Sequence, residues 1–267
     1  MRTDVSSQHS FVVLAHGESP FLEDCLRSLA AQTLKSTIIM VTSTPSAQTR
    51  QLAEQYSIRC LVNKHSRGIA DDWNFAMRSA DTPYVTLAHQ DDIYEVEYVE
   101  RMFSAAQGAV DALIIFSDYA QLDGKQKNSE TPLLRVKQAM LALGFLGRVA
   151  ISSRLAKRIL LSFGCPICCP SVMYHRELLA EQEFDNAFEV NLDWKYWIDI
   201  ISVEGAFVYV RRPLLTYRAH QATTTSGAIA SGRRKDEDLR CFNLLWPGAL
   251  AKVLSRFYAL SYLDELR

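Results

Sequence analysis

The chain has 267 residues, of which 48% are hydrophobic and 22% are charged. This composition is typical of a globular enzyme and excludes a disordered tail. The 29 Lys and Arg residues nearly balance the 30 Asp and Glu residues, and the formal net charge is -1. Such a balance excludes a protein that coats nucleic acid, so we expect no nucleic-acid partner and only a local site for any polyanion.

We expect no targeting segment at the start of the chain. The first ten residues are polar, and the apolar stretch after them is interrupted by His16 and Glu18, unlike the core of a signal peptide. The most apolar segment, residues 159–174, contains prolines, serines and a glycine and is too short to span a bilayer. Cys25 and Cys60 lie in apolar segments, where a reduced thiol behaves as a small hydrophobic group. These features predict a cytoplasmic protein with free thiols.

Short β-rich runs alternate with helical periodicities in the first half of the chain. The runs that predict strands are residues 11–15, 37–42, 58–62, 84–88 and 112–116. Between them, apolar residues recur three and four positions apart, as in Phe21, Cys25 and Leu29. This alternation is typical of a parallel sheet with crossover helices, and we therefore predict a wound α/β domain.

The second half is less regular. The expected elements are helical segments up to residue 162, a strand at 171–174, a helix capped by Asn191, extended runs at 206–210 and up to 217, and helices after 232 and 247. Residues 1–225 are predicted to form one domain. Residues 226–267 are predicted to form a helical extension that packs on this domain or serves in association.

The last helix carries an apolar stripe that includes Leu250, Val253 and Phe257. Such a stripe packs on its own domain or forms a homodimer. A third interpretation combines the stripe with the basic clusters at 211–212 and 233–235. Together they predict peripheral contact with an anionic membrane, which would place the protein at the inner face of the membrane.

Motifs in residues 9–225 resemble those of one known family. The first helical segment ends in Cys-Leu-Arg-Ser-Leu-Ala-Ala-Gln-Thr at residues 25–33, Gly68 precedes Asn74, and His-Gln-Asp-Asp occupies residues 89–92. In this order they are similar to the opening unit, the Gly-to-Asn spacing and the Asp-x-Asp motif of the family 2 glycosyltransferases. The resemblance implies the GT-A fold: a Rossmann-like, wound, mostly parallel sheet flanked by helices, here with a helical carboxyl-terminal extension.

The resemblance also implies an activity. Family 2 enzymes are inverting transferases that move a sugar from a nucleoside diphosphate to an acceptor hydroxyl, so we expect a nucleotide-sugar donor, a UDP-sugar first of all. The residues expected to contact the donor are Ala15, His16, Glu18, Gly68, Asn74, His89, Gln90 and Asp92. The acceptor is a saccharide, a lipid-linked molecule or a protein, and the expected role is the synthesis of cell-surface polysaccharide or glycoconjugate.

Asp91 and Asp92 end an apolar, β-rich run. Two acids at a strand end either bind a cation or cap the next helix. Cleavage of the bond to a diphosphate leaves negative charge, which a divalent metal held by one carboxylate and the phosphates stabilises. The resemblance therefore assigns Asp91 to Mn²⁺ or Mg²⁺, with His220 as a second ligand. Arg218 is expected either to reach a phosphate or to be an ordinary surface arginine.

The acceptor hydroxyl needs a base that removes its proton. Leu192-Asp193-Trp194 is similar to the Glu-Asp motif in which the family carries this carboxylate. The resemblance therefore implies that Asp193 is the catalytic base. The alternative is that Asp193 only stabilises the first turn of a helix, as acids often do.

The chain departs from the family pattern where relatives hold the nucleoside. His89 replaces the first acid of Asp-x-Asp, His16 replaces the usual Tyr, and residues 42–45 lack an acidic pair. Trp73 replaces an arginine that many relatives carry. An imidazole still stacks on a base or hydrogen-bonds a ribose, so these changes leave the identity of the base open.

Two rival functions remain open. A nucleotidyltransferase shares the wound sheet but usually opens with a basic, glycine-rich loop, which His16-Gly-Glu-Ser19 is not. A catalytically inactive sugar-nucleotide-binding or scaffolding protein would explain the departures at His16 and His89. The Cys165-x-x-Cys168 spacing does not predict zinc, because a second pair of ligands at a suitable distance is missing.

Overall fold

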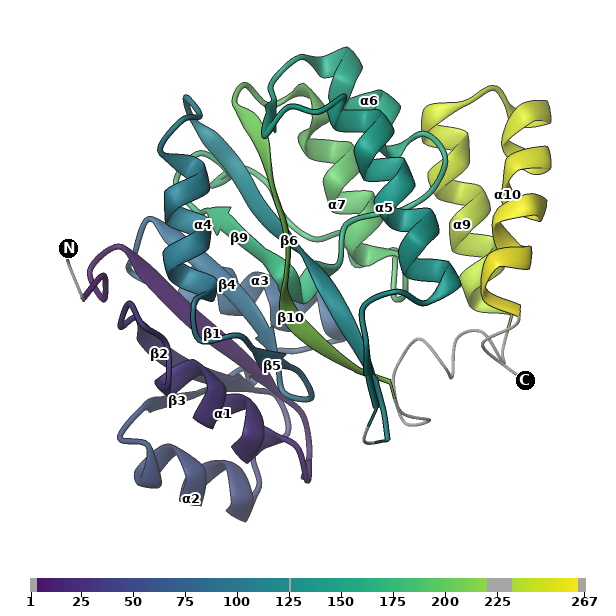
Figure 1. Cartoon of the computed structure of the whole chain (residues 1–267). Coiled ribbons are helices and arrows are strands. Elements are labelled where there is room, and N and C mark those ends of the chain that lie inside the picture. The colour runs from purple at the N-terminus through teal and green to yellow at the C-terminus, as the bar shows by residue number, and fades with distance from the viewer. Residues whose placement is uncertain (1–3, 125, 220–231, 264–267) are drawn as a thin grey trace.

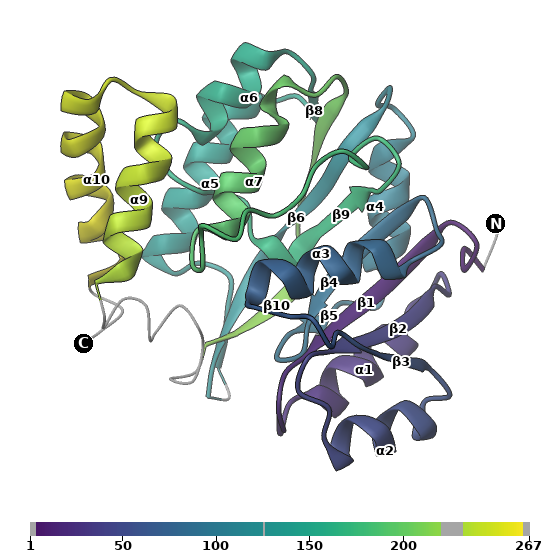
Figure 2. The same ribbon diagram turned by 180° about the vertical axis from the view of Figure 1, so that it is seen from behind.

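The computed structural model describes residues 4–124, 126–219 and 232–263. A ten-stranded sheet lies at its centre with helices on both faces (Figures 1 and 2). The strands are β1 (His9–Ala15), β2 (Thr37–Thr42), β3 (Arg59–Val62), β4 (Tyr84–His89), β5 (Ile93–Tyr94), β6 (Ala112–Asp123), β7 (Gln126–Asn128), β8 (Ala150–Ile151), β9 (Val172–His175) and β10 (Ala206–Ala219). The helices are α1 (Leu22–Ala30), α2 (Ala47–Gln55), α3 (Ile69–Ser79), α4 (Tyr98–Ala106), α5 (Pro132–Phe145), α6 (Arg154–Leu161), α7 (Leu192–Asp199), α9 (Arg233–Leu245) and α10 (Gly248–Leu263), with short 3-10 helices at Cys169–Ser171 and Ile200–Ser202. Among the helices within these ranges, none is both long enough and apolar enough to cross a membrane.

The first half of the sheet is parallel, as predicted. The strand order is β3-β2-β1-β4-β9-β6-β10-β5, so β1 lies between β2 and β4. Ala15 pairs with Thr42 on one side, and Leu14 pairs with His89 on the other. The chain therefore winds outward in both directions from β1, and the carboxyl ends of these strands meet at one edge, where open α/β sheets bind ligands.

The second half of the sheet is mixed. β9 is antiparallel to both β4 and β6, whereas β10 is parallel to β6 and antiparallel to β5 and β8. β10 is one continuous strand where two extended runs were predicted, and its register shifts around Pro213. A proline has no N–H for the ladder, so a strand accommodates it at such an irregularity.

Two apolar clusters fill the two faces of the sheet. Phe11 and Val13 point into one cluster and Val12 into the other, as the alternation of a strand requires. Helices α1 and α4 cover the first face, and α3, α5, α6 and α7 cover the second. The second cluster also contains Phe242 of α9 and Ala251 of α10. The carboxyl-terminal helices therefore share the core of the sheet.

His9 is a buried histidine in the middle of this architecture. Its ring nitrogens lie 2.8 Å from Ser36 Oγ and 3.0 Å from Thr86 Oγ1. Burial lowers the pKa of His9 to about 3. Because an unfolded histidine titrates near pH 6.5, only the unfolded state takes up this proton between pH 6.5 and about 3. The stability that neutral His9 contributes is therefore complete above pH 6.5 and is lost as the pH falls.

We expect the free energy of unfolding to fall by about 2 kcal/mol when the pH is lowered from 7.5 to 5, because the contribution of neutral His9 is lost over this range. Urea unfolding at a series of pH values would show this loss in the wild type and not in His9→Gln. The exposed His65 provides the control, because His65→Gln should keep the wild-type pH dependence. Equal slopes for wild type and His9→Gln would contradict the prediction.

Candidate active site

A cavity of about 510 Å³ lies at the carboxyl ends of β1, β2 and β4. Its other walls come from α3, α5, the segments 165–170 and 189–193, and the helices α9 and α10. The predicted site residues that line it are Ala15, His16, His89, Gln90, Asp91, Asp92 and Asp193. The two acids with distinct predicted roles, Asp91 and Asp193, therefore share one cavity although they lie far apart in the sequence.

Gln90 joins the two loops that form the strand-end wall. Its side-chain oxygen accepts a hydrogen bond from the His16 N–H at 3.0 Å, and its Nε2 donates to the His16 carbonyl at 3.2 Å. Thr44 Oγ1 accepts from the Gly17 N–H at 2.7 Å. The loops after β1, β2 and β4 are thus fixed to one another, and the amide of Gln90 is already engaged by protein atoms.

His89 lines the cavity as a neutral imidazole. Burial lowers its pKa to about 4, although the negative charge of Asp91 opposes this change. Its ring packs against Trp73 with the centroids 5.3 Å apart. Among the described residues, Nε2 of His89 is buried and has no hydrogen-bond partner. His89 therefore brings to the cavity wall an imidazole nitrogen whose hydrogen-bonding capacity is unused among the described residues.

The adjacent acids Asp91 and Asp92 differ in their surroundings. Asp92 is 1% exposed, and its Oδ1 accepts from the Arg218 N–H at 3.0 Å. Burial raises the pKa of Asp92 to about 8, so in the ligand-free protein this carboxyl is largely protonated near neutral pH. Asp92 thus ties the loop after β4 to the end of β10. Asp91 is more exposed and lines the cavity, so it is the better candidate for a contact with a bound cation.

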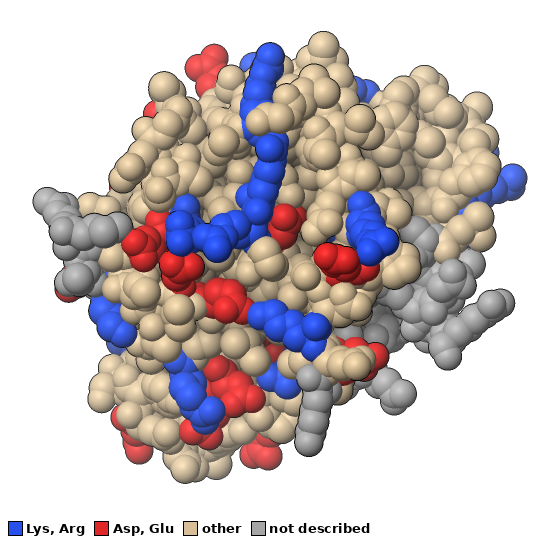
Figure 3. Space-filling view, viewed as in Figure 1, with Lys and Arg blue, Asp and Glu red and all other residues tan. Residues whose placement is uncertain are grey.

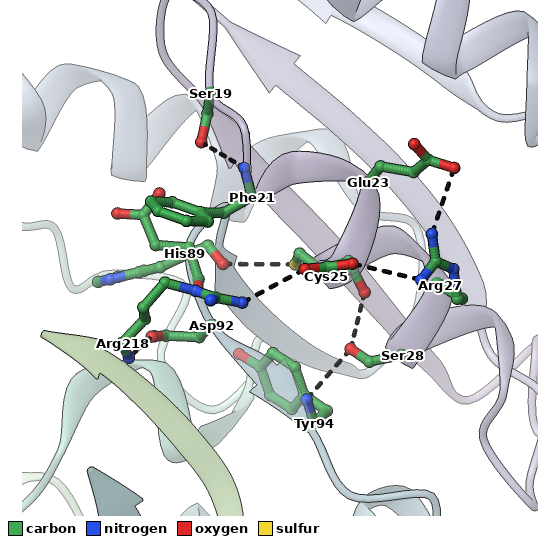
Figure 4. A network of polar contacts seen from close by, with 12 residues as sticks. Ser19, Phe21, Glu23, Cys25, Arg27, Ser28, His89, Asp92, Tyr94 and Arg218 are labelled. Atoms are coloured by element: carbon green, nitrogen blue, oxygen red, sulfur yellow. Dashed lines mark hydrogen bonds and ion pairs between the residues drawn. The ribbon is translucent and has the colours of Figure 1, made fainter. Parts of the chain in front are cut away.

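Arg218 lies between this loop and helix α1 (Figure 4). Its Nε donates to the Asp91 carbonyl at 3.0 Å, and its guanidinium approaches Asp24 Oδ2 at 3.4 Å and covers the ring of Phe21 at 4.3 Å. Its side chain is 15% exposed. The surface interpretation of Arg218 is therefore wrong, whereas its contact with a phosphate stays a prediction, since the residue also lines the cavity.

Asp193 occupies the first turn of α7. Its Oδ1 accepts from the Trp194 N–H at 2.7 Å, and the Cys165 Sγ lies 3.9 Å from its Oδ2. Burial raises the pKa of Asp193, while the Trp194 N–H and the positive charges of Lys137 and Arg234 act in the opposite direction. This combination, a desolvated carboxylate with cations nearby, suits a general base.

Helix α9 holds the segment that leads into Asp193. The carboxylate of Glu237, which is 4% exposed, accepts from the N–H groups of Glu189, Val190 and Asn191 at 2.8–2.9 Å. Asn191 precedes α7 as predicted, but its side chain does not cap the helix; it donates to Asp238 Oδ1 at 2.7 Å. The position of Asp193 therefore depends on acids of α9.

Three of the predicted donor residues do not line the cavity. Glu18 is exposed, and Gly68 precedes α3 at a place where a side-chain carbon would meet only open space. Asn74 is buried with both amide atoms bonded to the Phe184 backbone, at 2.8 and 2.9 Å. The interior position of Asn74 explains its presence without a ligand. His220, the predicted second metal ligand, lies outside the described residues.

Other residues of the cavity were missed in the sequence. Lys137 of α5, Arg234 of α9 and Tyr258 of α10 line it, and Lys137 Nζ donates to the Tyr119 hydroxyl at 3.0 Å. They lie outside any recognised motif, so only their spatial arrangement identifies them. Asp72 also lines the cavity.

Asp72 places a carboxylate beside residues 42–45, the segment that lacks the acidic pair of the family pattern. It accepts from Ser43 Oγ at 2.8 Å and from Asn63 Nδ2 at 2.9 Å. The acid therefore comes from α3 rather than from the loop after β2. In the sequence, only the position of Asp72 in the first turn of a helix could have pointed to it. An acid at this position is equally explained by a solvent-exposed helix start.

A divalent cation fits the chemistry of the strand-end wall. In the three described ranges, no group of three His, Cys, Asp or Glu side chains is arranged to hold a metal ion. Asp91 lines the cavity, and Oδ2 of Asp92 is buried with no hydrogen-bond partner among these residues. Such a donor set suits a hard cation that takes its remaining ligands from phosphates and water.

The sequence matches the family model described as Glycosyl transferase family 2 over residues 10–181, which is more than half of the chain. A search among curated proteins gave no significant match. The matched segment contains the whole strand-end wall of the cavity, and it ends before Asp193 and before α9.

Solved structures of other proteins share the fold. S. aureus TarS 1-349 in complex with UDP-GlcNAc has a TM-score of 0.63 and 15% sequence identity, over 96% of this chain and 73% of that one. The same TarS fragment in complex with UDP has a TM-score of 0.62 and 13% identity, over 96% and 72%. Mannosyltransferase PcManGT from Pyrobaculum calidifontis, in complex with GDP-Man and Mn²⁺, has a TM-score of 0.58 and 16% identity, over 96% and 69%.

Proposed function

The chain belongs to glycosyl transferase family 2, and on that premise we propose that it is an inverting enzyme that moves a sugar from a UDP-sugar to an acceptor hydroxyl. The observation that supports this proposal most directly is the shared cavity of Asp91 and Asp193, one at a strand end and the other at a helix start. An inverting transfer needs a group for the leaving diphosphate and a base for the acceptor on opposite sides of the sugar.

We propose that the nucleoside lies against the wall formed by β1, β2 and α3. The unpartnered Nε2 of His89 and the carboxylate of Asp72 are the polar groups that would recognise it. UDP-GlcNAc and UDP in the TarS complexes support a UDP-sugar, and GDP-Man in PcManGT shows the main alternative base. The cavity volume of about 510 Å³ lies within the usual range for small-molecule sites.

Asp91 is proposed to hold a divalent cation, Mn²⁺ or Mg²⁺, together with the donor diphosphate. When bound, the cation would neutralise the charge that develops on the leaving diphosphate. The Mn²⁺ in PcManGT supports the presence of such an ion in this fold. Asp92 contributes by fixing the loop through the Arg218 N–H, at 3.0 Å.

Asp193 is proposed to accept the proton of the acceptor hydroxyl as this attacks the anomeric carbon. The Trp194 N–H fixes one carboxylate oxygen and leaves Oδ2 toward the cavity side occupied by Cys165. Lys137 and Arg234 favour the ionised form that a base requires. Attack from the face opposite the diphosphate then inverts the anomeric centre.

We also propose that residues 1–225 form the transferase domain and that residues 226–267 complete it. Helices α9 and α10 supply Arg234 and Tyr258 to the cavity, and Glu237 of α9 holds the segment before Asp193. The extension therefore contributes to the site as well as to the core.

We expect Asp91→Asn to weaken metal-dependent donor binding about tenfold or more, because a neutral amide is a poorer ligand for a hard cation. Calorimetric titration of UDP and GDP, with and without Mn²⁺, measures this effect and identifies the base. Asp81→Asn is a matched control, since the Asp81 side chain is 89% exposed and lies outside the cavity. Binding that is indifferent to Mn²⁺ and to Asp91→Asn would contradict the metal assignment.

Donor turnover separates an enzyme from an inactive binding protein. We expect metal-dependent binding of one nucleotide to be followed by slow hydrolysis of the matching sugar donor in the absence of acceptor. Binding without hydrolysis or transfer would favour the inactive sugar-nucleotide-binding protein instead.

A further inference from the structure

Helices α5, α6 and α10 expose an unusual number of large apolar side chains. The exposed residues of these helices and of the short segments that follow α5 and α6 are Val136, Leu143, Leu146, Val149, Leu155, Ile159, Phe163, Leu250, Val253, Phe257 and Leu260. Leu143, Leu155 and Phe257 are each at least 67% exposed. Single exposed apolar residues are common, but a concentration of them on adjacent helices marks an interaction surface.

These helices form one continuous part of the molecule. Helices α5, α6, α9 and α10 lie together at one end in both views (Figures 1 and 2). The end of α6 meets the α9–α10 pair directly, because Phe163 packs on Trp246 with ring centroids 5.8 Å apart. We call the exposed residues of α5, α6 and α10 and of the segments after α5 and α6 the α6–α10 face.

Leu146 is the least expected residue of the α6–α10 face. It follows α5 with a left-handed backbone, φ +46°, a conformation that favours glycine or asparagine at a helix end. Its side chain is 74% exposed. Neither backbone preference nor burial in the described structure accounts for a leucine here, whereas insertion into an apolar medium would.

The charges of the α6–α10 face have one sign. Residues 131–176 contain seven Lys and Arg residues and no Asp or Glu, and residues 239–263 contain three and none, although acids make up 30 of the 267 residues. In the view of Figure 3, the area over α6 and α10 shows a few basic side chains and no acidic ones. The surface is therefore both apolar and basic.

The exposed basic residues of this face are not neutralised within the described chain. Arg148, Arg154, Lys252 and Arg256 are exposed and form no ion pair with a described residue. The basic cluster that stood out in the sequence behaves differently: Arg233 pairs with Glu189, and Arg234 faces the cavity. The unpaired charges are thus on α6, α10 and the segment after α5.

The sign of the charge argues against a second copy of the chain as the partner. A twofold dimer places the same patch of both subunits in contact. Since the face lacks acids, Arg154 and Arg256 would meet other basic groups, and this repulsion opposes association. The complementary partner is negatively charged and accepts bulky apolar side chains.

We propose that the α6–α10 face rests on an anionic lipid surface. The apolar side chains of α5, α6 and α10 enter the boundary between headgroups and acyl chains, and the arginines and Lys252 contact lipid phosphates. The proposal does not depend on the transferase activity. It does give a geometric consequence: α5 and α10 also carry Lys137 and Tyr258 into the cavity, so the same helices bear the membrane contact and the site.

Vesicle flotation tests the proposal with the whole chain. We expect binding to vesicles of phosphatidylcholine mixed with phosphatidylglycerol, little binding to phosphatidylcholine alone, and release at high salt. The double variant Arg154→Gln/Arg256→Gln should bind about thirtyfold more weakly, and Val253→Ser about fivefold more weakly.

Matched controls come from exposed residues elsewhere. Arg50→Gln on α2 removes one guanidinium group outside the face, and Val110→Ser before β6 removes one exposed valine; both should bind as the wild type does. Nucleotide binding in solution, measured without vesicles, should be the same in all variants and reports on folding and on the donor site separately.

Three results of the vesicle experiment would overturn the proposal. These are absence of binding to the anionic vesicles, equal binding to neutral and anionic vesicles, and wild-type binding by the double variant. A dimer seen by light scattering and abolished by Val253→Ser would instead identify the face as a contact between copies, which also overturns it.

Discussion

Asp193→Asn is expected to lower kcat for sugar transfer by about 10²–10⁴-fold while the protein stays folded and binds its donor. The amide keeps the shape of the carboxylate and can still accept from the Trp194 N–H, but it cannot take a proton from the acceptor. Steady-state kinetics with a saturating acceptor would measure the loss. Donor affinity should change little, because the proposed donor contacts come from other residues of the cavity, Asp91 and His89.

The pH profile provides a second measurement for Asp193. Because burial raises its pKa, the rate should fall on acidification at a higher pH than an exposed aspartate would give, since only the ionised form acts as a base. The residual rate of Asp193→Asn should lack this acid limb. Asp199→Asn, on the same helix but paired with Lys195 at 2.6 Å, is the control. A wild-type rate in folded Asp193→Asn would exclude Asp193 as the base.

Glu237→Ala is expected to lower the free energy of unfolding by about 3–5 kcal/mol and kcat by about 10²-fold. The substitution leaves three backbone N–H groups without their acceptor, that of Asn191 in a buried place and those of Glu189 and Val190 in partly buried places. The segment that positions Asp193 then loses its support. Urea unfolding and kinetics at a temperature where the variant is folded would measure the two effects.

The neighbouring acid provides the control for Glu237. Asp236 is exposed in the first turn of α9, so Asp236→Ala should change stability by no more than about 1 kcal/mol and leave kcat unchanged. Nucleotide affinity should be retained in Glu237→Ala, because the Glu237 carboxylate holds residues 189–191 and not the loops after β1, β2 and β4. A fall in nucleotide affinity equal to the fall in kcat would point to general unfolding rather than displacement of Asp193.

The first half of the fold could be predicted because its inner strands, β1, β2 and β4, are largely buried. The runs at 37–42 and 84–88 are uninterrupted apolar or β-branched segments, and they correspond to β2 and β4. β6 was predicted to end at Phe116 but continues to Asp123, because residues 117–123 pair with β10 and β7. The prediction stopped short because this part contains several polar residues. Alternating polarity does not reveal a strand that depends on distant partners.

The candidate site could be predicted where a residue follows a strand or begins a helix in a recognised motif. His89, Asp91 and Asp193 were predicted in this way, and all three line the cavity. Asn74 had the right spacing but serves the Phe184 backbone, and spacing alone does not distinguish the two roles. Lys137 and Arg234 come from helices without a motif, and only the packing of these helices brings them to the cavity.

Gly164 shows how closely the last helix packs against the start of the segment 165–170, which lines the cavity. A side-chain carbon at this position would overlap the Tyr258 ring, and the Tyr258 hydroxyl accepts from the Cys165 N–H at 3.4 Å. Synthesis on the ribosome proceeds from the amino terminus, so every strand of the sheet emerges before α9 and α10. A nascent chain therefore has all of the described strands before Tyr258 can close against Gly164, and the wall that Tyr258 gives the cavity is the last part to form. Ligand binding that needs this wall would begin only after α10 has been made.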